Sequence, residues 1–92
     1  MSSQPAGWHI ILARQPQKIL RKLPKELLQR IDLQFAALAK NPRPAGFKKL
    51  SGFDNLYRVR VGDWRISYAI EEQRLVILVL EIAPRGNAYR NL

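Results

Sequence analysis

NLYRVRVGDWRISYAI, residues 55–70, reads as two alternating strands joined by Gly62 and Asp63. A two-residue loop that opens with glycine is a strong hairpin signal, and it also fixes the register of the two strands. The predicted opposite pairs are Val61 with Trp64, Arg60 with Arg65, Val59 with Ile66, Arg58 with Ser67, and Tyr57 with Tyr68.

Side-chain alternation divides this hairpin into an apolar face and a cationic face. The cationic face carries Arg58, Arg60 and Arg65 together with Ser67; the apolar face carries Tyr57, Val59, Val61, Trp64, Ile66 and Tyr68. Like charges directly opposite one another destabilise a sheet, so the pairing of Arg60 with Arg65 needs a reason beyond folding. A solvated outer face is one explanation. Binding of an anionic partner is the alternative, and three arginines on one face favour it.

The length and composition limit the number of domains and the kinds of partner that this chain can have. The chain has 92 residues, enough for one domain with a modest core, which we expect over residues 8–92 after a flexible lead-in at residues 1–7. Lysine and arginine total 16 against 7 acidic residues, a formal charge of +9. Such a charge attracts nucleic acid, an acidic protein or an anionic membrane surface.

Several kinds of site and segment are not expected. The chain has no cysteine and a single histidine, so we predict no disulfide, no metal site and no cofactor. No apolar run approaches the roughly 20 residues of a membrane span, and residues 1–7 lack the features of a signal peptide. A cytoplasmic protein without a membrane partner is therefore expected.

The rest of the chain predicts an α+β fold. Residues 8–12 form a short apolar strand. Residues 14–23 are basic with helical spacing, and Pro16 fits a first helical turn. A second helix begins at Pro24 and runs to about Lys40, with an apolar stripe of Leu27, Leu28, Ile31, Phe35 and Leu38. The prolines and glycine of NPRPAG, residues 41–46, mark a loop that leads to the hairpin.

Residues 74–82, RLVILVLEI, are apolar on both faces, which is typical of a central strand. The predicted architecture is an N-terminal strand and a two-helix hairpin packed on a mainly antiparallel four-stranded sheet, followed by a short C-terminal tail. If Glu72 and Gln73 form a tight turn, Arg65 faces Leu80. Val76, Leu78 and Leu80 then share the arginine face, where the tail or a partner should cover them. Arg85 would emerge near Arg60 and Arg65.

This arrangement predicts a site for a phosphate backbone. Its members would be Arg58, Arg60, Arg65 and Arg85, with Lys48, Lys49 and Arg90 as further contacts and Tyr89 beside them. RNA carries its own nucleophile in the 2′-hydroxyl, so an enzyme that orients this group and stabilises charge on the phosphate can cleave RNA without a metal. Arginine is always protonated and is a poor base. We therefore assign the proton acceptor to Tyr89, with a pKa lowered by the surrounding arginines.

The sequence also resembles a known family. LPKELLQRI at residues 23–31, NPRP at 41–44, KKLSG at 48–52, YRVRVGDWRISY at 57–68 and APRGNAYR at 83–90 are similar to the RelE/ParE superfamily of bacterial toxins, and most to its RelE-like branch. The resemblance implies a toxin of a type II toxin-antitoxin system, neutralised by an antitoxin that wraps around it. RelE-like toxins are ribosome-dependent endoribonucleases that cut mRNA in the A site through 2′-hydroxyl attack, leaving a cyclic phosphate.

The family's functional residues map onto Arg58, Arg60, Arg65, Arg85 and Tyr89. Some members have lysines at the positions of Arg58 and Arg60, and many have histidine at the position of Pro84, so the resemblance leaves the identity of the base and the acid open. Two other readings stay open. ParE-like members inhibit DNA gyrase without cutting RNA, although that mode does not require Arg65, Arg85 and Tyr89. A non-catalytic RNA-binding module is the third reading.

Overall fold

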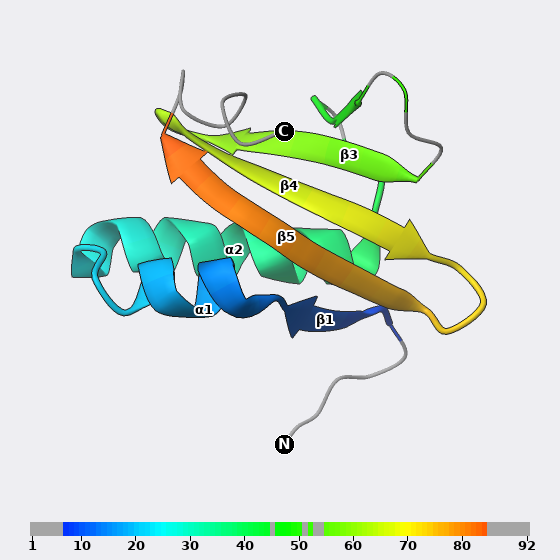
Figure 1. Cartoon of the computed structure of the whole chain (residues 1–92), viewed down its shortest axis with the longest axis horizontal. Helices are drawn as coiled ribbons and strands as arrows, with labels where there is room; N and C mark the ends of the chain where they lie inside the picture. The colour runs from blue at the N-terminus through cyan, green and yellow to red at the C-terminus, as the bar shows by residue number, and fades with distance from the viewer. Residues whose placement is uncertain (1–6, 45, 51, 53–54, 85–92) are drawn as a thin grey trace.

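A five-stranded mixed sheet with two helices forms the described part of the chain (Figure 1). The computed structural model describes residues 7–44, 46–50, 52 and 55–84. The elements in chain order are β1 (His9–Leu12), α1 (Arg14–Leu20), α2 (Lys25–Lys40), β2 (Lys48–Lys49), β3 (Leu56–Val61), β4 (Trp64–Glu71) and β5 (Val76–Pro84). The strand order is β1-β5-β4-β3-β2, with β1 parallel to β5 and the other pairs antiparallel.

The predicted α+β architecture is confirmed, with one addition. The sequence suggested four strands, and the structure adds β2, which pairs two lysines with β3. Two residues between a proline-rich loop and a hairpin carry too little periodicity to be recognised as a strand. None of the helices in the described residues is long and apolar enough to cross a membrane.

The β3–β4 hairpin has the predicted register, from Leu56 with Ala69 to Val61 with Trp64. Gly62 opens the turn with φ 61°, the left-handed region that glycine adopts without strain. A Cβ atom at Gly62 would lie 3.0 Å from the guanidinium of Arg30, which reaches the turn from α2. The left-handed conformation is therefore the main reason for glycine at this position, since the end of the flexible Arg30 side chain can shift at little cost.

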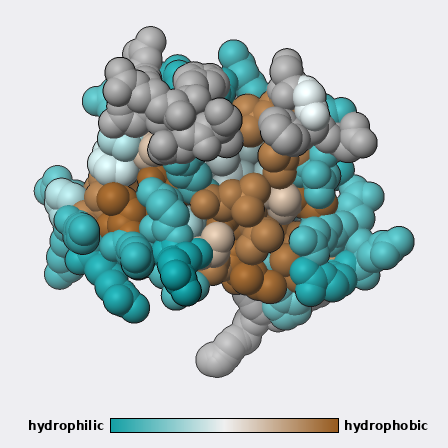
Figure 2. Space-filling view, in the orientation of Figure 1, coloured by the Kyte–Doolittle hydropathy of each residue, from teal (hydrophilic) through white to brown (hydrophobic). Residues whose placement is uncertain are grey.

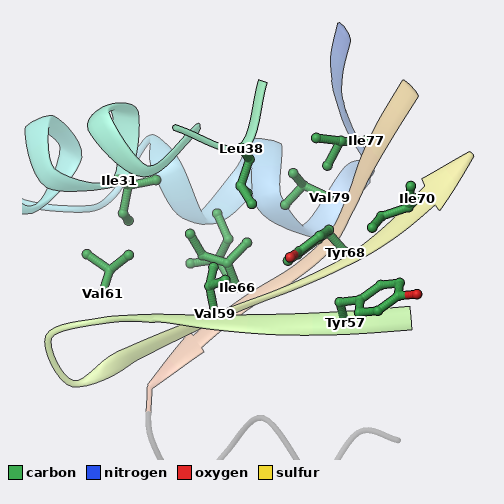
Figure 3. Packing of buried hydrophobic residues seen from close by; sticks show 11 residues of the cluster. Ile31, Leu38, Tyr57, Val59, Val61, Ile66, Tyr68, Ile70, Ile77 and Val79 are labelled. Atoms are coloured by element: carbon green, nitrogen blue, oxygen red, sulfur yellow. The ribbon is translucent and has the colours of Figure 1, made fainter. Parts of the chain in front are cut away.

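The core lies between α2 and one face of the sheet. Ile31 and Leu38 of α2 are fully buried, as the predicted stripe requires, and Figure 3 shows them facing the strand residues. Leu33 falls off this stripe and is 72% exposed. Burying these side chains contributes roughly 1.5–3 kcal/mol each, so the α2 contact is a major source of stability. The strand members of the core are Tyr57, Val59, Val61, Ile66, Tyr68, Ile70, Ile77, Val79 and Ile82.

The predicted register of β4 with β5 is wrong. Arg65 pairs with Ala83, three residues further along β5 than the predicted Leu80. Two features cause the difference. The connection is a longer loop that ends at Leu75, whose φ is 53°, and the register shifts again at an irregularity between Ser67 and Tyr68. Neither feature contains a glycine or proline that would indicate it in the sequence.

The outer edge of β5 is covered by two different elements. β1 pairs with its first half and ends where Leu12 pairs with Val79. Beyond that point the side chain of Gln15 takes over: its Nε2 donates to the carbonyl of Ile82 at 2.9 Å, and its Oε1 accepts from the Ile82 N–H at 3.0 Å. This contact fixes the start of α1 beside the C-terminal half of β5.

Candidate nucleic-acid interface

α2 covers one face of the sheet, and we call the other the open face. Residues in register on neighbouring strands share a face, so the pairings define rows across it. One row consists of Lys48, Arg58, Ser67 and Glu81. The next consists of Arg60, Arg65 and Ala83. The structure thus brings together four of the predicted cations, which we call the basic half of the open face: Lys48, Arg58, Arg60 and Arg65.

The remaining predicted residues are placed differently. Lys49 pairs with Tyr57 and so belongs to the opposite face of the sheet, although it is exposed. Arg85, Tyr89 and Arg90 lie outside the described residues. The last strand ends at Pro84, which pairs with Trp64 at the hairpin end, where Arg60 and Arg65 also lie.

The three arginines lie close enough to influence one another. Burial lowers the pKa of Arg58, and the charges of Arg65 and Arg60 lower it further. Arg60 is exposed, whereas Arg58 and Arg65 are half-buried. A folded sheet that holds like charges together in this way gains from any anion that neutralises them.

Glu81 is a residue of this surface that the sequence analysis missed. It lies opposite Ser67, because the longer loop and the irregularity between Ser67 and Tyr68 together move β5 along by three residues from the predicted register. The half-buried carboxylate of Glu81 therefore lies in the row of Arg58 and Ser67. No local pattern in residues 76–84 could have shown this, because the signal is the pairing with β4.

The other half of the open face is apolar. Its central row consists of Ile11, Leu78, Ala69 and Leu56. Ile11 is 43% exposed at the β1 edge, and Figure 2 shows hydrophobic residues gathered over the region of β5 and β1. Val76 and Leu78 lie on the arginine face as predicted, whereas Leu80 falls at the irregularity between Ser67 and Tyr68, and Ala83 lies opposite Arg65.

The loop before β2 is anchored on the hairpin. The guanidinium of Arg43 lies 5.6 Å from the centroid of the Tyr57 ring and pairs with Glu72 at 2.8 Å. Hydrogen bonds to Glu72 and then to Tyr57 raise the pKa of Arg43. Phe47 packs on Tyr57 with ring centroids 5.6 Å apart. These contacts hold the loop in place and so position Lys48 opposite Arg58.

Among the described residues, no group of three or more histidine, cysteine, aspartate or glutamate side chains is arranged to hold a metal ion. In the two rows that hold the basic half, the described polar groups are the four cations, the Ser67 hydroxyl and the Glu81 carboxylate. Such a set can bind phosphate groups, stabilise negative charge that develops on them, and accept a proton.

Comparisons with known proteins agree with this geometry. The family described as "ParE toxin of type II toxin-antitoxin system, parDE" matches residues 10–89. The chain is 34% identical over 77 residues to a Methanocaldococcus jannaschii protein named as a RelE1 toxin, covering 80% of this chain and 86% of that protein. It is 26% identical over 84 residues to the RelE toxin of Mycobacterium tuberculosis, covering 90% of this chain and 87% of that protein.

Solved structures of toxin-antitoxin complexes contain a chain with a similar fold. The archaeal RelE-RelB complex of Pyrococcus horikoshii superposes with a TM-score of 0.77 at 32% identity, covering 86% of this chain and 96% of that chain. The RelBE toxin-antitoxin complex of E. coli gives a TM-score of 0.76 over 86% of this chain and 98% of that chain. Its identity is only 17%, so that match concerns the fold alone.

Proposed function

Because the chain belongs to the ParE toxin family of type II toxin-antitoxin systems, with RelE toxins among its relatives, we propose that it is an endoribonuclease that cuts mRNA in the ribosomal A site. The observation that carries this proposal is the basic half of the open face. Its four cations lie in two adjacent rows of a rigid sheet. A surface that only needed solubility would not place Arg60 opposite Arg65.

The proposed reaction uses the nucleophile of the RNA itself. The 2′-oxygen attacks the adjacent phosphorus, the bond to the 5′-oxygen of the next nucleotide breaks, and a 2′,3′-cyclic phosphate and a 5′-hydroxyl result. One proton leaves the 2′-hydroxyl and one is delivered to the departing 5′-oxygen. Arg58, Arg60 and Arg65 would stabilise the charge that builds on the phosphate oxygens, since fixed donors act most strongly where charge develops.

The other roles follow from the family resemblance. Arg85 and Tyr89, outside the described residues, are proposed as a further phosphate contact and as the group that stacks on a base or moves a proton. Lys48, Lys49 and Arg90 would contact RNA or ribosome. The ribosome would hold the mRNA strand in the geometry for in-line attack, which this small surface does not enforce alone. The reaction would take place in the cytoplasm, without a cofactor or metal.

An antitoxin is the second proposed partner. The solved relatives include RelE-RelB complexes. The apolar half of the open face offers the exposed Ile11 side chain next to Leu78, and the formal charge of +9 favours an acidic or amphipathic segment. Such a segment would wrap around the toxin and compete with RNA for the cations.

Replacing Arg65 tests the proposed site. Arg65→Ala removes one guanidinium from the basic half. We expect the rate of cleavage of ribosome-bound mRNA to fall by about 100-fold or more. Arg74→Ala is the matched control: it removes one arginine at the other end of the sheet, where Arg74 pairs with Glu71. We expect this control to cut within about twofold of the wild type. The measurement is the initial rate at which new mRNA 5′ ends appear on programmed ribosomes, with thermal unfolding of each variant as a check on folding.

The opposite outcomes separate the alternatives. Wild-type rates for Arg65→Ala would place the reaction elsewhere. Growth arrest with DNA damage and no new 5′ ends would identify the protein as a gyrase inhibitor, the activity that the ParE members suggest. We also expect naked RNA to be cut poorly, and rapid cleavage of naked RNA would contradict the ribosome dependence. The pair Arg85→Ala and Tyr89→Phe extends the test to the tail.

A further inference from the structure

We propose that Glu81 is the general base of the proposed cleavage: its carboxylate accepts the proton of the 2′-hydroxyl that attacks the phosphate. This inference rests on the proposed function and names the residue that takes the first proton in it. Glu81 lies on β5 opposite Ser67, in the row that also holds Arg58. It is half-buried on the open face. The carboxylate therefore lies beside the cations that would hold the scissile phosphate.

A bulge in β5 places Glu81 on the open face. Ser67 pairs with Glu81 and the next residue, Tyr68, pairs with Val79, so Leu80 is an extra residue between the two pairs. In a regular register Leu80 would take the place opposite Ser67. Glu81 would then turn toward the core, because a shift of one residue moves a side chain to the other face of a sheet. The bulge is thus what brings a carboxylate to the arginines, and bulges beside active sites commonly redirect a side chain in this way.

The distances between strand positions suit a base for this reaction. Arg65 is the diagonal neighbour of Glu81 on β4, and such neighbours are about 7–8 Å apart. Arg58 lies in the same row on β3, two strands from Glu81, which is roughly 10 Å between backbones. The 2′-oxygen must approach phosphorus to about 3–3.5 Å before it attacks. A phosphate held by Arg58 and Arg65 therefore brings its own ribose into the neighbourhood of the Glu81 carboxylate.

The other polar groups of these two rows cannot take the proton. Arginine and lysine side chains have donors and no acceptor, which excludes the four cations of the basic half. The hydroxyl of Ser67 belongs to a residue that is only 4% exposed, so a substrate does not reach it. Among the described polar groups of the two rows, the Glu81 carboxylate is the acceptor that remains.

Acceptors on other parts of the described chain are less well placed. Glu71 lies at the opposite end of the sheet, where it pairs with Arg74. The single histidine of the chain, His9, pairs with Val76 near that same end. Asp63 is two residues from Arg65, but it is exposed in the hairpin turn, beyond the row of Arg60 and Arg65 and away from the row of Arg58. Glu81 is thus the described carboxylate that lies within the basic half.

The proposed step balances its bonds and protons. The O–H bond of the 2′-hydroxyl breaks as the carboxylate takes the proton, and the 2′-oxygen forms its bond to phosphorus. The bond from phosphorus to the 5′-oxygen breaks, and this oxygen takes a proton from water. Glu81 returns its proton to the solvent after the product has left. Tyr89, which the sequence predicts as the proton acceptor, would then stack on a base instead.

Substitution of Glu81 tests the proposal in single-turnover cleavage of mRNA on programmed ribosomes. Glu81→Gln keeps the shape of the side chain and removes its ability to take the proton, so we expect the rate constant to fall by about 100-fold or more. Glu81→Asp keeps a carboxylate and should recover part of the rate. Asp63→Asn is the matched control, because it removes one carboxylate from the other side of Arg65. This control should cut within about twofold of the wild type. Thermal unfolding checks that each variant is folded.

The pH dependence separates a base from a residue that only holds the arginines in place. In Glu81→Gln, hydroxide must take the proton, so the residual rate should rise about tenfold per pH unit, more steeply than in the wild type and in Asp63→Asn. Affinity for ribosomes should equal or exceed that of the wild type, since a negative charge beside the cations is removed. A slow Glu81→Gln variant with the pH dependence of the wild type would overturn the proposal. So would a rate within about threefold of the wild type.

Failure of the proposed reaction gives a different result. A wild-type protein that cuts no mRNA on ribosomes would refute the reaction and the role of Glu81 together. A wild-type protein and a Glu81→Gln variant that cut equally fast would leave the reaction standing and refute the role of Glu81 alone.

Discussion

Tyr68 is a core residue whose hydroxyl bonds the loop before β2. The same hydroxyl makes the stability of the protein depend on pH. Tyr68 is fully buried, and its hydroxyl donates to the carbonyl of Pro42 at 2.8 Å. Its ring stacks on Tyr57, with centroids 6.0 Å apart. Burial is the main cause that raises the pKa of Tyr68 to about 12 from 10.0. The hydroxyl therefore keeps its proton in the folded state long after an unfolded chain has lost it.

We predict a loss of stability at high pH that depends on Tyr68. Between pH 10 and pH 12 the unfolded state binds fewer protons than the folded state, so the free energy of unfolding falls as pH rises. The stabilisation is complete below pH 10, and its loss amounts to about 1–2 kcal/mol. Urea unfolding midpoints from pH 8 to pH 11.5 measure it. Tyr68→Phe should be less stable at pH 8 by about 1 kcal/mol and should show a flatter profile. Parallel profiles for the two proteins would contradict the assignment.

At the scale of elements, the side chain of Gln15 makes the edge hydrogen bonds with β5 that a neighbouring strand would otherwise make. β1 is too short to reach the end of β5, and a single amide side chain satisfies both backbone groups of Ile82. Pro84, two residues further on, has no N–H to leave unpaired at this edge. The edge is thus protected against pairing with other chains without a further strand.

We expect Gln15→Ala to lower the free energy of unfolding by about 1–3 kcal/mol, because two part-buried backbone groups lose their partner. Gln17→Ala is the matched control, since Gln17 lies in the same helix and makes one exposed bond to the carbonyl of Leu12. That control should change stability by less than about 0.5 kcal/mol. Chemical denaturation of the two variants compares them directly. Equal effects would show that the clamp on Ile82 contributes nothing specific.

The same scale shows what the sequence could and could not predict. The register of the β3–β4 hairpin follows from a two-residue turn, and the core face of α2 follows from periodicity, because both depend on residues close in the chain. The pairing of β4 with β5 depends on a loop with a left-handed Leu75 and on an irregular pairing, and neither has a compositional signal. The arginines were therefore grouped correctly, while Glu81 was missed and Leu80 was misplaced. The contact of Gln15 with Ile82 spans 67 residues and was equally hidden.

At the scale of the whole molecule, the chain combines a local hairpin with a distant strand pair. β3 and β4 are joined by two residues, whereas β1 pairs with β5 although every other described element lies between them in the chain. Closing a long loop costs entropy before its contacts give any stabilisation. The hairpin and α2 should therefore form the folding nucleus, and β1 should dock late.

Folding kinetics can test this order. We predict that Val59→Ala, in the hairpin, mainly slows folding, with a φ-value of about 0.5 or more. Leu12→Ala, in β1, should mainly speed unfolding, with a φ-value of about 0–0.3. Both changes remove partly or fully buried methyl groups, so the equilibrium effect should be large enough to measure. Stopped-flow chevrons of the two variants give the values, and the reverse ranking would place β1 in the nucleus.

The loop between β4 and β5 offers a position at which a fluorescent dye can be attached. Gln73 is exposed in that loop, at the end of the sheet remote from Arg60 and Arg65, and makes none of the contacts described above. The natural chain contains no cysteine. Gln73→Cys would thus create a single thiol for a fluorescent dye, away from the basic half of the open face and from the turn at Gly62. A labelled protein of this kind would report its arrival on ribosomes, and its capture by an antitoxin, in real time.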